Sequence, residues 1–383
     1  MDATDPLAIA AGLIRCPSVT PDQGGALDLL QALLEPLGAV CHRLTFQKEG
    51  TAAVENLYAR IGTAAPHLAF AGHVDVVPPG DEAAWSVPPF AAEIRDGWLI
   101  GRGACDMKGG IACFVAAVAR HVRDHGSLPG SVSFLITADE EGDAINGTAA
   151  LVDWLRARGE TIDACLVGEP TNPSALGEVA KVGRRGSLNG TLTVHGRQGH
   201  TAYPERADNP VPRLLAMLDA LMQPLDGGTD AFQPSHLEIT TIDVGNPARN
   251  VIPARAVAGF NVRFNDRFTA STLDAELRER CAGIGGGFDL VCTSGAEAFR
   301  TEPGPLSREL AQAIDDVVGR RPELNTLGGT SDARFIKDIA PVIEFGLVGQ
   351  SMHAVDERVA VADLGTLTAI YGRFLDRYLT GRR

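Results

Sequence analysis

The sequence has no C-x-x-C pair, and its seven cysteines are an odd number. Most of them stand beside apolar residues, as Cys105 does after Ala104. We therefore expect buried free thiols in a reducing compartment rather than a disulfide framework. A chain of 383 residues buries about three quarters of its unfolded surface on folding, so its core needs no such staples.

Long apolar runs are also missing. No stretch reaches about 18 apolar residues without a charge, so we expect no segment that spans a membrane. Residues 1–6 (MDATDP) lack the basic region and the apolar core of a signal peptide. The sequence therefore predicts a cytoplasmic protein with no membrane partner.

An excess of basic charge is absent too. The 34 Lys and Arg residues are outnumbered by 48 Asp and Glu residues, and the formal net charge is -14. Such a chain has no general attraction for nucleic acid or for an anionic membrane, although the acidic excess can equally serve solubility alone. If the substrate is an anion, local Arg or Lys side chains must bind it against the overall field.

Strand and helix patterns alternate over the first part of the chain and again near its end. Short apolar runs that end in polar residues predict strands, and apolar residues at helical spacing predict helices. This alternation is typical of a mostly parallel sheet with packed helices. The expected helices cover 7–14, 24–37, 108–123, 147–158, 305–319 and 361–379, and the expected strands cover 67–72, 131–136, 163–167 and 341–345.

The pattern changes near residue 178. Residues 187–195 alternate apolar and polar side chains, as a half-exposed strand does. The elements that follow complete the order β-α-β-β-α-β, which is ferredoxin-like. They are helices at 210–223 and 271–282 and strands at 236–244, 255–264 and 287–292. The sequence thus predicts an α/β catalytic domain over 1–178 and 296–383, interrupted by an inserted α+β domain over 179–295.

Acidic and His residues stand just past the C-terminal ends of the predicted parallel strands, or in the loops behind them. In open α/β sheets ligands bind at this edge, so these side chains can converge although they are far apart in the chain. Each one alone is ordinary, and only the joint pattern indicates a site. The set comprises His73, Asp75, Asp106, Glu140, Glu141, Glu169 and His353.

Imidazole and carboxylate ligands suit zinc, and also cobalt or manganese. The number of candidate ligands fits two metal ions about 3.5–4 Å apart, bridged by a carboxylate and a water molecule. Asp75 can accept the second ring N–H of His73, two residues before it. Of the neighbouring Glu140 and Glu141, one can bind metal while the other stays free as a general base. No serine or cysteine has a paired base nearby in the sequence, which agrees with hydrolysis by an activated water.

These motifs resemble those of the M20 metallopeptidases, a family of zinc-dependent aminoacylases and carboxypeptidases. The matching stretches follow the order of the family over almost the whole chain. They are GHVDVVP at 72–78, GRGACDMK at 101–108, ADEEG at 138–142, GEP at 168–170, GRRGS at 183–187, GHTAYP at 199–204, GGTSDARF at 328–335 and MH at 352–353.

The resemblance implies two zinc ions in each subunit, for which cobalt can substitute. Asp106 would bridge the two ions. The remaining ligands would be His73 and Glu169 for one ion, and Glu141 and His353 for the other.

The resemblance also implies roles for residues that bind no metal. Glu140 would be the general base, and Asp75 would orient His73. The peptide bond after Asp106 is expected to be cis. The inserted domain would form a homodimer, and His200 of the partner subunit would stabilise the oxyanion of the reaction.

Within the family, the stretches at 183–187, 199–204 and 328–335 favour enzymes that release succinate from an anionic N-acyl diamino acid. The carboxylates of such a substrate need local cations and hydrogen-bond donors. The choice between Arg184 and Arg185 stays open, and Asp332 and Arg334 are expected to form an ion pair nearby. The candidate substrate-binding residues are Arg184, Arg185, Tyr203, Asn250, Arg263, Gly329, Thr330 and Ser331.

Two alternatives to a desuccinylase remain. The first is a related deacylase with the same metals, such as an acetylornithine deacetylase or an aminoacylase. The basic residues that face the acyl group would discriminate, because an acetyl group lacks the carboxylate of a succinyl group. The second is a non-catalytic dimer that kept the fold as a binding module. Such a protein would be expected to have lost Glu140 or a metal ligand, and none is missing here.

Overall fold

The computed structural model describes residues 1–381, and the chain divides into two compact units. Unit 1 comprises Met1–Val182, Thr301–Asn325 and the residues from Ser331 onward. Unit 2 comprises Gly183–Arg300 and Thr326–Thr330. Each unit has its own cluster of buried apolar side chains, so each is described by itself.

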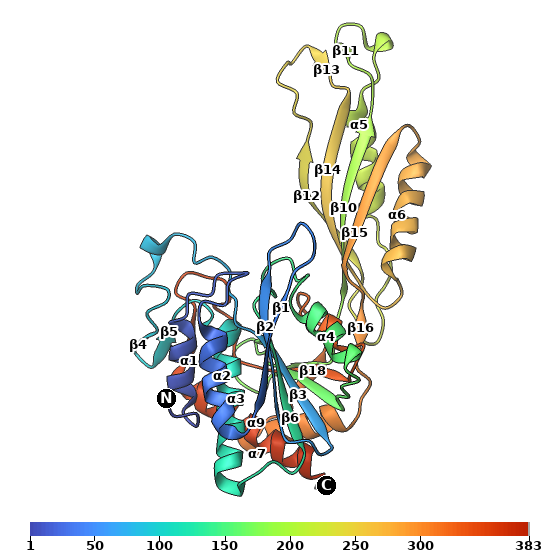
Figure 1. Cartoon of the computed structure of the whole chain (residues 1–383). Helices are drawn as coiled ribbons and strands as arrows, with labels where there is room; N and C mark the ends of the chain where they lie inside the picture. Colours follow the sequence, from blue (N-terminus) through green and yellow to red (C-terminus); the bar gives the residue numbers. More distant parts are fainter. Residues whose placement is uncertain (382–383) are drawn as a thin grey trace. The chain divides into compact units, whose positions relative to one another are not determined.

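Unit 1 is built on an eight-stranded sheet (Figure 1). In spatial order its strands are β1 (Val40–Phe46), β2 (Val54–Ile61), β6 (Ser131–Thr137), β3 (His67–His73), β7 (Ala164–Val167), β18 (Val342–Glu344), β8 (Val179–Lys181) and β17 (Glu323–Asn325). The strands from β6 through β3 and β7 to β18 run parallel, as do β8 and β17. The pairs β1–β2, β2–β6 and β18–β8 are antiparallel. The sheet is therefore mixed but mostly parallel, which confirms the predicted class.

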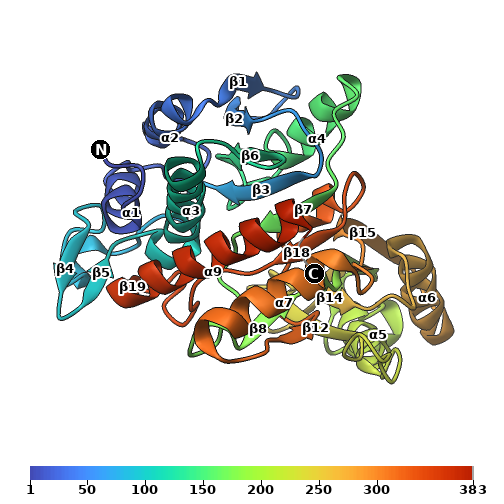
Figure 2. The same ribbon diagram turned by 90° about the horizontal axis from the view of Figure 1, so that it is seen from below.

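Helices α1, α3, α9 and α7 lie together against one face of this sheet (Figure 2). The helices of unit 1 are α1 (Pro6–Ile14), α2 (Ala26–Leu34), α3 (Gly109–His125), α4 (Thr148–Ala157), α7 (Pro305–Val318), α8 (Ala333–Ile336) and α9 (Val361–Thr380). Aromatic rings join them to the sheet. Phe70 of β3 stacks on Phe114 of α3 with ring centroids 4.2 Å apart. Phe134 of β6 and Tyr371 of α9 meet Phe114 edge-on. This packing fixes α3, whose first turn follows Asp106.

The parallel register brings several chain segments to one edge of the sheet. β3 ends at His73, and β6 ends at Thr137, just before the loop that carries Glu140. β7 ends two residues before Glu169. Because β3 lies between β6 and β7, these three carboxyl ends are neighbours.

A small three-stranded sheet completes the same region. Its strands are β4 (Glu93–Arg95), β5 (Trp98–Ile100) and β19 (Arg358–Ala360). β5 pairs with β19, so the segment that precedes residues 101–106 lies beside the segment that follows His353. The backbone N–H of Gly101 also donates to the carbonyl of Glu357 at 2.8 Å. This pairing brings Asp106 and His353 to the same region, although they are remote in sequence.

Unit 2 has a four-stranded antiparallel sheet with the ferredoxin-like order. Its strands are, in spatial order, β12 (His236–Asp243), β14 (Arg255–Phe264), β10 (Gly186–His195) and β15 (Phe288–Ala296), and its helices are α5 (Pro210–Met222) and α6 (Ala270–Ile284). Apolar side chains of both helices pack on the sheet in one cluster. The unit also has two separate two-stranded sheets: β11 (Gly199–His200) with β13 (Val251–Ile252), and β9 (Gly183–Arg184) with β16 (Phe299–Arg300).

The structure departs from the sequence-based expectation in a few places. The chain enters unit 2 at residue 183 rather than 179 and leaves it at residue 301 rather than 296. Strands β1 and β2 were not predicted. β1 is an edge strand with mostly half-buried side chains, so it lacks the apolar run by which the neighbouring strands were recognised. The seven cysteines are free, and four of them are buried, whereas Cys16, Cys41 and Cys292 are only half-buried.

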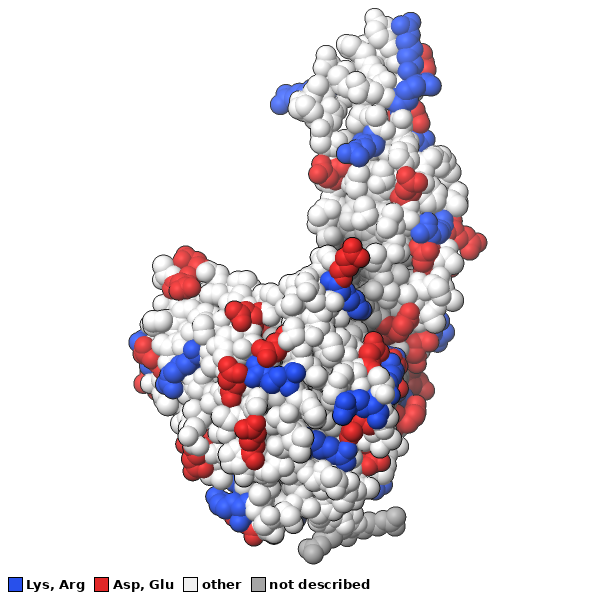
Figure 3. All heavy atoms as spheres, viewed as in Figure 1, with Lys and Arg blue, Asp and Glu red and all other residues white. Residues whose placement is uncertain are grey.

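Two further observations concern the surface. On the face of unit 1 drawn in Figure 3, basic and acidic side chains are interspersed and form no continuous basic stripe. Over residues 1–381, no helix is both long enough and apolar enough to cross a membrane.

Candidate metal centre

His73 stands at the end of β3 with its imidazole buried among carboxylates. Its Nε2 atom lies 3.2 Å from Oδ1 of Asp106 and 3.7 Å from Oε1 of Glu169. Only 1% of the His73 side chain is exposed to solvent. Three side chains from different segments of the chain thus present N and O donors to one point.

His353 faces the other side of Asp106. Its Nε2 atom lies 3.3 Å from Oδ2 of Asp106 and 2.8 Å from Oε1 of Glu141. Asp106 therefore directs one carboxylate oxygen toward His73 and the other toward His353. The backbone of His353 has φ 61°, a left-handed conformation that residues other than glycine rarely adopt. Residues held in this conformation often serve a function, because the surrounding structure must impose it.

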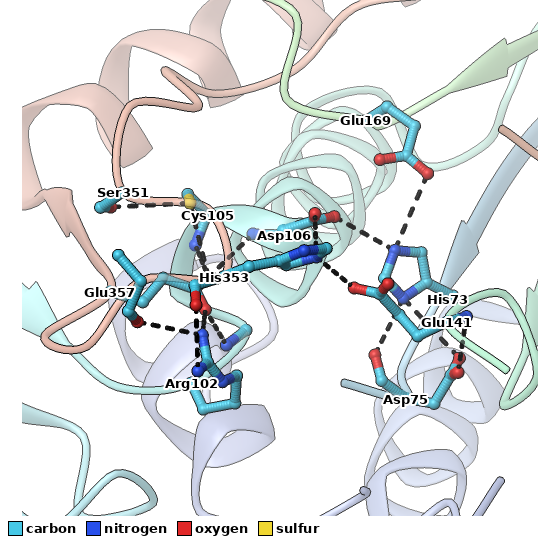
Figure 4. A network of polar contacts seen from close by, with 12 residues as sticks. His73, Asp75, Arg102, Cys105, Asp106, Glu141, Glu169, Ser351, His353 and Glu357 are labelled. Carbon is cyan, nitrogen blue, oxygen red and sulfur yellow. Dashed lines mark hydrogen bonds and ion pairs between the residues drawn. The ribbon is translucent and has the colours of Figure 1, made fainter. Parts of the chain in front are cut away.

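The turn that carries Asp106 is held by a buried ion pair (Figure 4). Arg102 donates from Nη1 to Oε2 of Glu357 at 2.8 Å, and both side chains are almost completely buried. The Glu357 carboxylate also accepts backbone N–H groups of Gly103, Cys105 and Asp106 at 2.9–3.2 Å. The peptide bond from Asp106 to the next residue is cis, as the family resemblance implies.

Arg102 also reaches the chain around His353. Its guanidinium donates to the carbonyl oxygens of Ala354 at 3.2 Å and of His353 at 3.4 Å. One buried Arg–Glu pair therefore supports the segments on both sides of the Asp106–His353 contact. Sequence reasoning quoted Arg102 within a motif but gave it no role, and it missed Glu357. The only sequence signal for Glu357 is its position four residues after His353.

Asp75 holds the loop that presents Glu140 and Glu141. Its two carboxylate oxygens accept the backbone N–H groups of Glu140 at 3.3 Å and Glu141 at 3.0 Å. The contact between Asp75 and Nδ1 of His73 is made by the backbone carbonyl at 2.9 Å, whereas the nearest carboxylate oxygen is 3.7 Å away. Asp75 is thus beside His73 as expected, but its carboxylate is a hydrogen-bond acceptor for the neighbouring loop. Asp139 closes that loop by accepting the N–H groups of residues 145 and 146.

Burial and mutual repulsion shift the pKa values of the carboxyl groups in this cluster. Burial raises the pKa of Glu140 to about 8, and repulsion from nearby carboxylates adds to the shift. Burial likewise raises the pKa of Glu169, which Asp106 and Glu140 raise further. Burial also disfavours the charge of Asp106, but contacts with His353 and His73 hold the pKa of Asp106 below its usual range. The acids outnumber the imidazoles that offset them.

Within this cluster, two groups of three side chains have ligand atoms close enough together to hold a metal ion. The triads His73–Asp106–Glu141 and His73–Glu140–Glu169 each have ligand atoms within 4.8 Å of one another. His353 belongs to neither triad, but its contacts with Asp106 and Glu141 are shorter than that limit. The pairwise contacts therefore group the side chains differently from the triads. They place His73 with Glu169 and His353 with Glu141, and each imidazole faces a different oxygen of Asp106.

Unit 2 carries most of the predicted substrate-binding residues. Arg184 is buried and donates to the carbonyl oxygens of Leu327 at 3.4 Å and Gly329 at 2.9 Å. Arg185 is half-buried, its Nε atom has no hydrogen-bond partner, and burial together with the neighbouring Arg263 lowers its pKa. Among the described residues, neither Arg185 nor Arg263 forms an ion pair with an acid. The two guanidinium groups thus form a cationic patch without a carboxylate.

His200, Tyr203 and Asn250 lie together at another part of unit 2. The His200 ring is 5.8 Å from the ring of Tyr203, and the N–H of Thr201 donates to the carbonyl of Asn250 at 3.1 Å. All three predicted residues are exposed. Strand β10 separates them from Arg185, and its nine steps span about 30 Å. Within one chain, these residues and Arg185 cannot contact the same small substrate.

The stretch at 328–335 is divided between the units. Gly329 and Thr330 belong to unit 2, whereas Ser331 belongs to unit 1 and donates its hydroxyl to Glu344 at 2.8 Å. The expected ion pair between Asp332 and Arg334 is wrong. Asp332 accepts the hydroxyl of Thr148 at 2.6 Å instead, and the guanidinium of Arg334 stacks over the ring of Phe335.

Comparison with known proteins identifies the class. The profile described as Peptidase family M20/M25/M40 matches residues 69–377, so the chain belongs to this family. Among solved structures, an aminopeptidase PepT from Bacillus cereus superimposes with a TM-score of 0.79 at 18% identity, covering 99% of each chain. An M20 family metallo-carboxypeptidase from Sulfolobus solfataricus gives a TM-score of 0.78 at 17% identity, covering 98% of this chain and 99% of its own. These likenesses establish the fold.

Sequence relatives are more similar. A protein from Rhodospirillum centenum is 60% identical over 380 residues, which cover 99% of this chain and 98% of its own length. A protein from Methylorubrum populi is 60% identical over 386 residues, covering 99% of this chain and 100% of its own. Both are named succinyl-diaminopimelate desuccinylase.

We expect Glu357→Gln to lower the affinity of the cluster for a divalent metal ion by about 10- to 100-fold and to lower kcat with it. The amide cannot accept all the N–H groups that now meet the carboxylate, and it leaves the buried charge of Arg102 without a counter-charge. Equilibrium dialysis against zinc measures the affinity.

The matched control is Glu93→Gln, which breaks the exposed pair of Glu93 with Arg95 at 2.9 Å. This variant should bind zinc as the unaltered protein does, because exposed pairs contribute little. Unchanged zinc affinity in a folded Glu357→Gln protein would show that the buried pair does not position Asp106.

Proposed function

We propose that the chain is a zinc-dependent amide hydrolase that cleaves N-succinyl-LL-2,6-diaminopimelate to succinate and LL-2,6-diaminopimelate. The observation that carries this proposal is the 60% identity, over 99% of the chain, to relatives named succinyl-diaminopimelate desuccinylase. The reaction belongs to the biosynthesis of lysine and diaminopimelate. The free cysteines are in keeping with a cytoplasmic location.

The donor set fits two zinc ions, with cobalt as a possible substitute. We assign His73 and Glu169 to one ion and Glu141 and His353 to the other, with Asp106 shared, because each imidazole faces a different oxygen of Asp106. The excess of buried carboxylates supports this, since divalent cations would offset their repulsion. When bound, the ions would supply Lewis acidity that polarises the amide carbonyl and acidifies a water molecule.

Glu140 is assigned as the general base because it makes no ion pair among the described residues, although it lies within the cluster. Its carboxylate takes a proton from the attacking water and later passes it to the leaving amine. The N–H contact with Asp75 holds the Glu140 backbone in place during this transfer.

Arg185 and Arg263 are assigned to the carboxylates of the substrate. Their guanidinium groups are half-buried, repel each other and have no acidic partner among the residues described, so an anion between them would be stabilised. Arg184 is the weaker candidate, because it donates to backbone carbonyl groups. We therefore resolve the open choice in favour of Arg185.

The distances within unit 2 favour a homodimer in which substrate is bound by two chains. About 30 Å separates the ends of β10, so His200 and Arg185 of one chain cannot both contact one substrate. If both residues bind it, they must come from different subunits. His200 of the partner subunit would donate a hydrogen bond to the developing oxyanion. Tyr203 and Asn250 lie beside His200 and would arrive with it, while the backbone and side chains of residues 329–331 would remain with the first subunit.

A second candidate function is that of another M20 deacylase, such as an acetylornithine deacetylase or an aminoacylase. It would use the same metal centre and the same base. The cationic patch at Arg185 and Arg263 favours the desuccinylase, because an acetyl group carries no charge for it to bind.

Steady-state hydrolysis of N-succinyl-LL-diaminopimelate and N-acetyl-ornithine, offered separately to the zinc-loaded protein, tests the proposed substrate. We expect a large preference in kcat/KM for the succinyl compound, abolished by a chelator and restored by zinc. Arg185→Met should lower kcat/KM for the succinyl compound by about 10- to 100-fold, the cost of one lost charged hydrogen bond.

The matched control is Arg255→Met, because Arg255 is exposed on β14 and makes no ion pair in the part of the chain that is described. It should leave kcat/KM unchanged. Preference for the acetyl compound would contradict the proposed substrate but not the proposed metal centre.

Glu140→Gln should keep both metal ions and lower kcat by about 100- to 10,000-fold, because it removes the base and no ligand. Glu141→Gln should instead weaken zinc binding. Zinc content after dialysis and kcat are measured on the same samples. Loss of zinc from Glu140→Gln would show that Glu140 is a ligand and that its role as base is wrong.

Mixed dimers of His200→Ala and Glu140→Gln test whether His200 acts across the dimer. Each parent is expected to be nearly inactive, but a heterodimer has one site with both residues intact. A random mixture should therefore recover about a quarter of the unaltered activity, since half of the dimers are mixed and half of their sites work. No recovery on mixing would exclude a role for His200 in the partner's site.

A further inference from the structure

A second cluster of metal-type donors lies in unit 1, away from the candidate metal centre. It consists of His121 and His125 on α3 and Asp376 on α9, whose ligand atoms lie within 4.8 Å of one another. Nδ1 of His121 is 2.8 Å from Oδ1 of Asp376, and the two imidazole rings have centroids 4.6 Å apart. His121 stands twelve positions after Gly109, which follows the Asp106 turn, so the cluster lies about 18 Å along the helix.

The spacing of the two histidines suits chelation. Residues four apart on a helix project from the same face, and two His at this spacing can bind one zinc ion. Asp376 adds a carboxylate from the neighbouring helix, and α3 and α9 pack side by side (Figure 2). Ligand atoms on a tetrahedral zinc ion lie about 3.4 Å apart, so the existing His121–Asp376 contact needs to widen only slightly.

Two arginines stand beside the cluster, and both are paired with acids. His125 is the last residue of α3, and the negative end of a helix dipole attracts positive charge. Arg373 and Arg377 are nearby but already paired: Arg373 with Asp316 at 2.8 Å, and Arg377 with a carboxylate at 3.0 Å. An anion would have to displace these pairs and would meet Asp376.

The cluster also has space for a bound ion and water. It borders a surface cavity of about 490 Å³, which His121, His125 and Asp376 line together with Ser127, Pro129, Thr380 and the paired Arg373 and Arg377. His125 is exposed, so the cavity is open to solvent and an ion can enter. Water can complete the coordination shell of an ion held by three protein ligands.

We propose that His121, His125 and Asp376 bind one divalent transition-metal ion of the zinc class. The ion takes the place of the direct contact between Nδ1 of His121 and Oδ1 of Asp376 and joins α3 to α9. Because the two helices come together only in the folded chain, the ion stabilises the fold and takes no part in hydrolysis. This site is independent of the function proposed for the centre at Asp106.

Metal counting on the full-length protein tests the proposal. The protein is equilibrated with zinc above saturation of the candidate metal centre, and bound zinc per chain is measured by mass spectrometry of the metal. His125→Ala and Asp376→Asn should each bind one zinc fewer than the unaltered protein. The matched control is His195→Ala. His195 is an exposed imidazole 2.7 Å from Asp289, and among the described residues it belongs to no group of three possible metal ligands.

Thermal unfolding gives a second readout. Excess zinc should raise the Tm of the unaltered protein and of His195→Ala by a few degrees, but not that of His125→Ala. Equal Tm values without zinc would show that the variants fold alike. Equal zinc stoichiometry in His125→Ala and the unaltered protein would overturn the proposal, as would the loss of one zinc from His195→Ala.

Discussion

Buried carboxylates can share one edge of a sheet only if positive charge offsets their repulsion. At an effective dielectric constant near 20, two such charges 4 Å apart repel by about 4 kcal/mol. Asp106, Glu140, Glu141 and Glu169 meet at this edge with few imidazoles and with raised pKa values at Glu140 and Glu169. Without cations, the repulsion in the cluster therefore lowers the stability of the fold, and the same carboxylates are well suited to bind cations. We regard the need for bound divalent cations as the constraint to which the rest of unit 1 responds.

The fold meets this constraint with hydrogen-bond donors placed behind the cluster. The Glu357 carboxylate accepts hydrogen bonds from three backbone N–H groups and from Arg102, and these contacts hold the chain around Asp106 in place. Asp75 fixes the loop of Glu140 in the same manner. The carboxylates of Glu357 and Asp75 make no hydrogen bond to a candidate ligand atom, yet they set where those atoms lie. Loss of such a supporting contact commonly lowers metal affinity or activity by about 10- to 100-fold.

Much of this arrangement could be predicted from the sequence, because strongly buried strands end in apolar-to-polar transitions that are visible in it. His73 and Glu169 follow such runs, and the parallel register then brings them together. Glu357 could not be predicted, because its role arises from contacts with residues about 250 positions earlier. Arg184 and Arg185 could not be separated either. Arg184 ends β9, whereas Arg185 lies between β9 and β10, and only the hydrogen bonds of the folded chain show that Arg184 is the one that meets backbone carbonyls.

The most direct test of the account is to locate the metal ions. Crystals of the zinc-loaded protein, measured at the zinc absorption edge, should give two anomalous peaks about 3.5–4 Å apart. One should lie about 2.0–2.1 Å from Nε2 of His73 and the other at the same distance from Nε2 of His353, with Asp106 bound to both. A single peak in this region, or two peaks of which Asp106 touches only one, would contradict the dinuclear centre.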